Sequence, residues 1–155
     1  MDSFEAADQL LDAGDGKAAL AMFERVAERD GRVSAMHSIA HTYLYGIAGV
    51  ERNYQLAFKW FSRAAQGGCP QAMYHLGLCH SEGYGVPKNP GQSYSWYKKS
   101  AELDDEDAAF RVGGCLEEGF GVEKNLEKAR EWYRAAAGKG QSDAIRRLAE
   151  LDGKK

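Results

Sequence analysis

The sequence repeats with a period of 36 residues, and this repetition limits the possible folds more than any other feature. The three tryptophans of the chain have this spacing, and so do three asparagines: Trp60, Trp96 and Trp132, and Asn53, Asn89 and Asn125. The units are residues 35–71, 72–107 and 108–143, and a partial fourth begins at Ala144. Such a period is typical of solenoids, in which each unit buries its apolar face by stacking on its neighbours. The sequence therefore predicts an array of stacked repeats.

Each unit has the pattern of two helices. The first helix buries residues three or four positions apart, and two units share this pattern: Ala72, Leu76, Cys79 and His80, with counterparts Ala108, Val112, Cys115 and Leu116. Asn89 and Asn125 precede the second helix, where an Asn side chain accepts an unpaired N–H, and Pro90 suits the first helical position. The second helix of the third unit then buries Ala129, Trp132, Tyr133, Ala136 and Ala137. We therefore expect the tryptophans to be core residues.

Paired glycines lie between the two helices, as in EGYGVPKNPG at residues 82–91. Gly83, Gly85, Gly119 and Gly121 allow positive φ values, which reverse the chain between antiparallel helices. The alternative is a phosphate-binding loop, which requires G-x-x-x-x-G-K-[ST] or a strand before the glycines, and the sequence has neither. The glycines therefore predict a turn and not a nucleotide site.

The composition is that of a globular protein from a reducing compartment. A net charge of −3 without a basic stripe argues against nucleic-acid binding. No apolar run reaches the roughly 18 to 20 residues that cross a bilayer, and the N-terminus lacks the pattern of a signal peptide. Three scattered cysteines favour reduced thiols over a disulfide framework. We expect a cytoplasmic protein that does not insert into membranes.

The repeated motifs resemble Sel1-like repeats, which are relatives of the tetratricopeptide repeat. The resemblance rests on A-x-x-x-[LV]-G-x-[CY], G-x-G-V-x-x-N and W-Y-x-x-[SA]-A, and it covers residues 35–151, although Ser93 stands where the pattern prefers Ala. Residues 3–34 are more similar to a tetratricopeptide hairpin, with Asp15 as a helix cap. The resemblance implies an all-α fold, a right-handed superhelical solenoid of antiparallel helix pairs. We expect a single domain over residues 1–155, with a capping helix in 144–155.

The resemblance also implies a function. Sel1-like proteins typically hold partner proteins and are not usually enzymes, so we expect a scaffold or adaptor that binds a protein or peptide without a cofactor. Two alternatives stay open, a regulatory subunit that activates a bound enzyme and a metal-dependent hydrolase. His37 and His41 have the four-residue spacing of paired metal ligands on a helix, but no HExxH motif or C-x-x-C pair supplies further ligands. We therefore predict no catalytic or metal-binding residue.

In a tetratricopeptide-like superhelix, the concave wall consists of the exposed face of each first helix. Transferred by alignment, this geometry predicts the partner-binding residues His37, His41, Tyr45, Tyr74, Leu78, Glu82, Phe110, Glu117 and Glu118. His37, Tyr74 and Phe110 occupy one position in successive units, and such an aromatic ladder suits a bound peptide, although these rings can also pack between helices. Acidic residues gather in the third unit, which predicts that a basic part of the partner lies there, unless these acids only solvate the helix.

Overall fold

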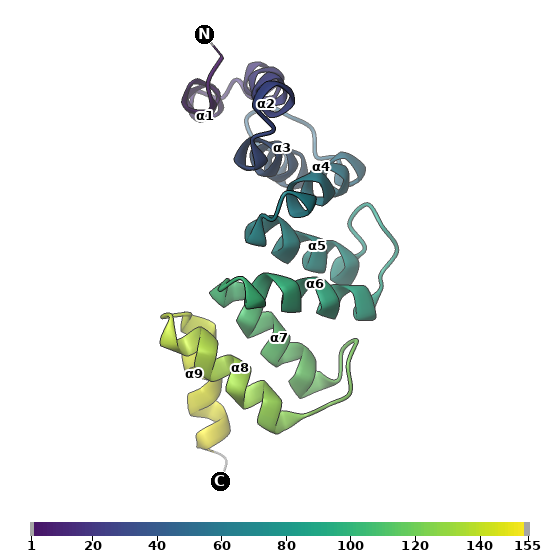
Figure 1. The fold of residues 1–155 in the computed structure, drawn as a ribbon, viewed down its shortest axis with the longest axis vertical. Helices are drawn as coiled ribbons and strands as arrows, with labels where there is room; N and C mark the ends of the chain where they lie inside the picture. The colour runs from purple at the N-terminus through teal and green to yellow at the C-terminus, as the bar shows by residue number, and fades with distance from the viewer. Residues whose placement is uncertain (1, 154–155) are drawn as a thin grey trace. The chain divides into compact units, whose positions relative to one another are not determined.

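The computed structural model describes residues 2–153, and within this range the chain forms nine α-helices and no β-strand (Figure 1). In chain order they are α1 (Phe4–Asp12), α2 (Gly16–Asp30), α3 (Val33–Tyr45), α4 (Tyr54–Gln66), α5 (Pro70–Glu82), α6 (Pro90–Glu102), α7 (Glu106–Glu118), α8 (Leu126–Gly138) and α9 (Ser142–Asp152). Six pairs of helices that follow one another in the chain pack together, among them α3 with α4 and α7 with α8. This pattern is expected for a repeat protein. The prediction of an all-α solenoid built from helix pairs is confirmed.

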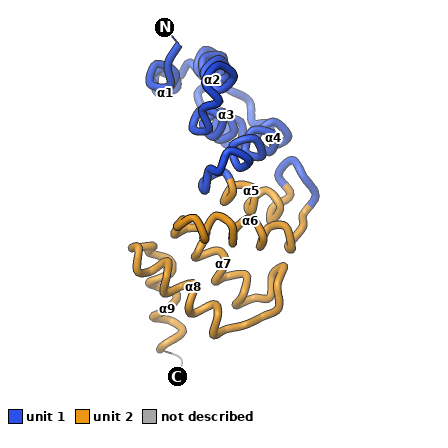
Figure 2. Tube along the Cα trace, viewed as in Figure 1, with its two compact units in different colours: residues 1–72, 84–87 blue, residues 73–83, 88–155 orange. Residues whose placement is uncertain are grey.

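The helices fall into two compact units (Figure 2). The first unit runs to Ala72 and includes the turn Tyr84–Pro87, and its core contains Leu20, Phe23, Ile39, Leu44 and Phe61. The second unit comprises Met73–Gly83 and the chain from Lys88 onward. The single domain over residues 1–155 stays a prediction, and residues 1, 154 and 155 lie outside the described range. Of the described helices, none combines the length and apolar character that a membrane span requires.

Side-chain caps begin the second helix of every repeat, as predicted. The Oδ1 atoms of Asn53, Asn89 and Asn125 each accept a hydrogen bond from the backbone N–H three residues later, at 3.0 to 3.1 Å. Asp15 caps α2 in the same way, and Pro90 occupies the first turn of α6. Each such cap contributes about 1 kcal/mol to helix stability. The asparagines therefore fix where each second helix starts.

In the second unit, a tyrosine lying on a glycine closes each helix pair. Tyr97 of α6 packs on Gly77 of α5, and Tyr133 of α8 packs on Gly113 of α7. A β-carbon added at Gly77 or Gly113 would lie 2.5 Å from the facing ring. Ser93, where the family pattern prefers Ala, is buried and donates a hydrogen bond to the carbonyl of Gly77 at 2.8 Å. The substitution is therefore accommodated within the same close contact.

The tryptophans are less deeply buried than the sequence suggests. Trp60 is 7% exposed, whereas Trp96 and Trp132 are only partly buried. The residue after each tryptophan is the one that fills the core, and these residues are Phe61, Tyr97 and Tyr133. Successive positions on a helix are about 100° apart, so only one of two adjacent rings can point directly at the neighbouring helix. The expectation of a core residue is thus correct for Trp60, whereas the burial of Trp96 and Trp132 is only partial.

The glycine turn of each repeat lies against the first turn of the preceding second helix. Gly83, Gly85, Gly119 and Gly121 all have positive φ, between 72° and 79°, as predicted for the turn. A β-carbon at Gly121 would collide with the carbonyl group of Pro90 at the start of α6. Gly85 approaches the carbonyl of Tyr54 at the start of α4 in the same way. The second glycine of each pair is therefore required by both its backbone conformation and its close contact.

In the first repeat the turn makes the same kind of contact, but the glycine belongs to the preceding helix and not to the turn. Ala48 lies in the turn with a φ of 54°, and its carbonyl accepts a hydrogen bond from the N–H of Gly16 at 3.0 Å. A β-carbon at Gly16 would lie 2.6 Å from that carbonyl oxygen. The glycine of α2 thus supplies the space that the turn glycine supplies in the later repeats.

Candidate functional site

Three of the predicted partner-binding residues lie along α3 in the first unit. The rings of His37 and His41 are 6.1 Å apart, and those of His41 and Tyr45 are 4.6 Å apart, between ring centres. His37 and His41 are half-buried, whereas Tyr45 is 47% exposed. Burial lowers the pKa of His41, because the apolar surroundings disfavour the imidazolium. The three rings form a continuous row of tilted contacts on one face of the helix.

The aromatic ladder makes the same contact in every repeat. His37 packs against Phe61, Tyr74 against Tyr97 and Phe110 against Tyr133, with ring centres 5.6 to 5.7 Å apart. Each ladder ring lies on the buried ring of the second helix in its own repeat, and each is itself half-buried. One side of the ring therefore belongs to the core, and the remainder stays accessible.

Tyr74, Leu78 and Glu82 follow one another along α5. Tyr74 and Leu78 are half-buried and Glu82 is exposed. The guanidinium carbon of Arg111, on α7, lies 6.0 Å from the centre of the Tyr74 ring. Such a contact between a cation and an aromatic face is attractive. The contact holds Arg111 of α7 close to α5.

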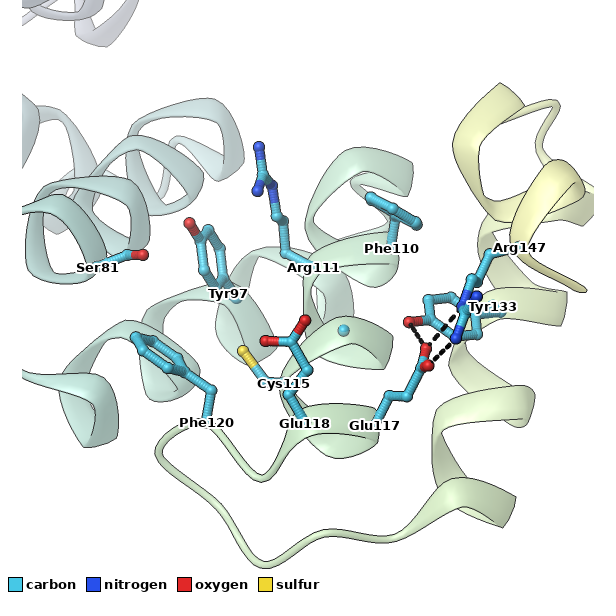
Figure 3. Close-up of a pocket in the computed structure, with 11 residues that line it drawn as sticks. Ser81, Tyr97, Phe110, Arg111, Cys115, Glu117, Glu118, Phe120, Tyr133 and Arg147 are labelled. Atoms are coloured by element: carbon cyan, nitrogen blue, oxygen red, sulfur yellow. Dashed lines mark hydrogen bonds and ion pairs between the residues drawn. The ribbon is translucent and has the colours of Figure 1, made fainter. Parts of the chain in front are cut away.

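A pocket on α7 brings together Phe110, Glu117 and Glu118, and it lies wholly within the second unit (Figure 3). It has a volume of about 370 Å³. Its walls come from five helices and one turn, and the lining residues are Ser81 of α5, Tyr97 of α6, Phe110, Arg111, Gly114, Cys115, Glu117 and Glu118 of α7, Phe120 of the turn, Tyr133 of α8 and Arg147 of α9. Four aromatic rings with a few polar groups are the usual lining of a site that takes one apolar group.

Glu117 is held by two neighbours inside this pocket. Its carboxylate accepts a hydrogen bond from the Tyr133 hydroxyl at 2.8 Å and a two-pronged ion pair from the Arg147 guanidinium (Figure 3). Arg147 also pairs with Glu150 at 2.8 Å. Burial and the Glu117 carboxylate both raise the pKa of the Tyr133 phenol, because they disfavour a second negative charge. Glu117 therefore contributes to the wall of the pocket as part of a hydrogen-bonded network.

Glu118 and Arg111 lie at the rim and are exposed. Neither forms an ion pair with another residue of the range 2–153. Cys115 lies between them along α7, and burial raises the pKa of its thiol to about 11, with the Glu118 carboxylate adding to the shift. The thiol is therefore protonated and poorly nucleophilic near neutral pH.

Sequence reasoning missed several lining residues, above all Arg111, Gly114, Phe120 and Arg147. One signal for Gly114 was present, because the aligned positions of the earlier repeats carry the side chains of His41 and Leu78. Arg147 belongs to the partial fourth repeat, where the 36-residue spacing makes it the counterpart of Arg111. Among residues 2–153, no three His, Cys, Asp or Glu side chains gather in a way that could hold a metal ion.

Comparison with known proteins identifies the repeat. The profile of the family described as Sel1 repeat matches residues 33–69, 70–105 and 106–141. These matches cover the three units found from the sequence, in a frame that starts two residues earlier, at the beginning of each first helix. A search of curated proteins finds no significant match.

Solved structures show the same arrangement. A Sel1 repeat protein from Oxalobacter formigenes is 34% identical over 94% of the chain, with a TM-score of 0.86. A protective antigen of uropathogenic Escherichia coli with an SLR fold is 30% identical over 97% of the chain, with a TM-score of 0.83. The chain spans 59% of the first protein and 33% of the second. Helicobacter pylori cysteine rich protein B, at 24% identity over 79% of the chain and 92% of its own length, shares the fold with a TM-score of 0.61.

Proposed function

Because the chain belongs to the Sel1 repeat family, we propose that it is a scaffold that binds a partner protein on the exposed faces of α3, α5 and α7. Sel1 repeat proteins generally mediate protein–protein interactions and are typically not enzymes. The observation that carries the proposal is the pocket on α7, which exposes aromatic rings between charged residues. The partner-binding residues are His37, His41, Tyr45, Tyr74, Leu78, Glu82, Phe110, Glu117 and Glu118, with Glu117 acting through its contacts to Tyr133 and Arg147.

The charges favour a partner whose basic part lies on the third repeat. Glu118 is exposed and without an ion pair in the described chain, and Asp107 at the start of α7 is also exposed. Opposite charges across such an interface set the register of the partner and speed its association. We place the interaction in the cytoplasm, since Cys69, Cys79 and Cys115 are all free thiols.

Charge reversal on two sets of helices tests this surface. The variant Glu82→Lys with Glu118→Lys changes the last residues of α5 and α7, both exposed. The control, Glu102→Lys with Glu131→Lys, makes the same change in net charge on exposed positions of α6 and α8. Proteins captured by the purified chain from its native lysate are compared by quantitative mass spectrometry. We expect the first variant to lose specific partners that the control retains; identical losses in both would contradict the proposed surface.

A further inference from the structure

The pocket on α7 exists because the third repeat lacks a side chain at one position of its first helix. His41 and Leu78 occupy this position in the earlier repeats, and Gly114 occupies it in the third. Gly114 is partly exposed and lines the pocket together with Phe110 and Glu118. Glu118 of the third repeat therefore has an opening beside it, whereas its exposed counterpart Glu82 follows the side chain of Leu78.

The fold itself does not require this glycine. A β-carbon at Gly114 would meet only the Tyr133 hydroxyl, at the ordinary contact distance of 3.9 Å, whereas one at the adjacent Gly113 would lie 2.5 Å from the Tyr133 ring. Gly114 has no left-handed φ, since it is absent from the positive-φ glycines of the chain. A glycine inside a helix destabilises it by roughly 0.5 to 1 kcal/mol relative to alanine. Gly114 thus weakens α7 and creates an open space that packing does not use.

The chemistry around this space defines what fits it. The partly exposed rings of Phe110 and Phe120 supply aromatic surface, which favours an apolar occupant. The charged groups at and beside the pocket are the carboxylates of Glu117, Glu118 and Glu150 and the guanidiniums of Arg111 and Arg147, so acids are in excess. Arg147 forms ion pairs with both Glu117 and Glu150, and the Arg111 guanidinium contacts the ring of Tyr74. Glu118 is the carboxylate that remains available for a cation.

We propose that the space at Gly114 receives a bulky apolar side chain of the partner, and that a lysine or arginine next to it in the partner pairs with Glu118. This inference rests on the proposed protein-binding function and specifies its occupant. The apolar side chain supplies the binding energy by leaving water, and the cation fixes its orientation along α7. A glutamate or aspartate of the partner on Arg111 is the competing arrangement.

Selection from a displayed library of random peptides tests the proposal, with the purified full chain as the target. The wild type should enrich peptides that pair a Phe, Trp, Tyr, Leu or Met with an adjacent Lys or Arg. In Gly114→Leu the new side chain fills the space, so binding of the enriched peptides should weaken about tenfold or more. In Glu118→Lys the apolar preference should persist, while the preference for an adjacent base should be lost.

Gly114→Ala serves as the control for folding, because its β-carbon finds open space and should raise the melting temperature while leaving most of the pocket. If Gly114→Leu unfolds, a small loss of binding in Gly114→Ala, whose methyl group takes up part of the space, and the altered preference of Glu118→Lys decide the question. Enriched peptides that bind Gly114→Leu as well as wild type would overturn the pocket and leave the scaffold function standing. Enrichment of acidic residues beside the apolar one would overturn the role of Glu118. Failure of the wild type to enrich any peptide would overturn the proposed occupant of the pocket, while the capture from lysate would still decide the scaffold function.

Discussion

Two adjacent glycines in α7 have opposite surroundings, and this difference is measurable. Gly113 lies against the ring of Tyr133, while Gly114 faces the open pocket. We expect Gly113→Ala to destabilise the protein by about 1 to 3 kcal/mol through overpacking. Gly114→Ala should stabilise it by about 0.5 to 1 kcal/mol, because alanine favours the helix. Urea unfolding of the two variants checks the prediction, and a loss of stability of similar size in both would contradict the geometry.

At the same scale, the sequence predicted which positions face the core but not how neighbouring side chains share it. Helical spacing assigned Tyr133 and Trp132 together to the buried face, yet only the tyrosine is fully enclosed. Glu117 was expected on the exposed wall, although the 36-residue spacing aligns it with Ser81 and places Gly114 at the wall position. The bonds of Glu117 to Tyr133 and Arg147 depend on where α8 and α9 end up relative to α7, and a periodic pattern carries no such information.

The helices and their boundaries are the part of the structure that the sequence predicts best. Each second helix starts at a capping asparagine, and the last helix, expected at about 142–151, spans Ser142–Asp152. Local chemistry suffices here, because a cap satisfies donors within its own first turn. The contact between each turn and the preceding helix was not foreseen, since it joins positions about one unit apart.

That contact leads to a prediction about the turn. Gly121 needs a left-handed backbone and also lies against the Pro90 carbonyl, so Gly121→Ala should cost about 3 kcal/mol or more from both penalties together. Gly138, the last residue of α8, has no atom within 4 Å of an added β-carbon, and Gly138→Ala should leave stability nearly unchanged. Melting temperatures by circular dichroism compare the two variants. An equally small shift for Gly121→Ala would show that the turn does not lock onto α6.

For the molecule as a whole, the repeat period determines the fold class, but the proposed binding site lies where the repeats differ. Stacking of equivalent units explains why a period marked by three tryptophans and three asparagines predicted a solenoid. The pocket instead depends on Gly114, which departs from its counterparts, and on Arg147, which lies beyond the complete repeats. Departures from the consensus are therefore the positions to search for function in such a chain.

The two compact units also differ in their buried weak acids, which predicts different responses to alkaline pH. In the second unit, burial raises the pKa of Cys79 to about 12 and that of Cys115 to about 11, and it raises the pKa values of Tyr97 and Tyr133 as well. In the first unit, burial and the Glu24 carboxylate raise the pKa of Tyr43. The second unit should therefore be the more sensitive to high pH.

Stability falls with rising pH because the folded protein favours the protonated form of these thiols. A thiol in the unfolded chain ionises near pH 9, so the stabilisation is complete below pH 9 and is lost as the pH rises toward the folded pKa values. Each thiol then removes up to about 1.4 kcal/mol per pH unit. Urea unfolding followed by tryptophan fluorescence at pH 8 and pH 10.5 can report on each unit separately. The variant Trp60→Phe keeps tryptophans in the second unit only, and the double variant Trp96→Phe with Trp132→Phe keeps one in the first unit only. We expect the midpoint to fall further with pH for the second unit, and Cys115→Ala to reduce that fall, because alanine does not titrate. If the unfolding midpoints of both units fell equally with pH, or if the midpoint fell as far with Cys115→Ala as with the native cysteine, these buried thiols would not govern alkaline stability.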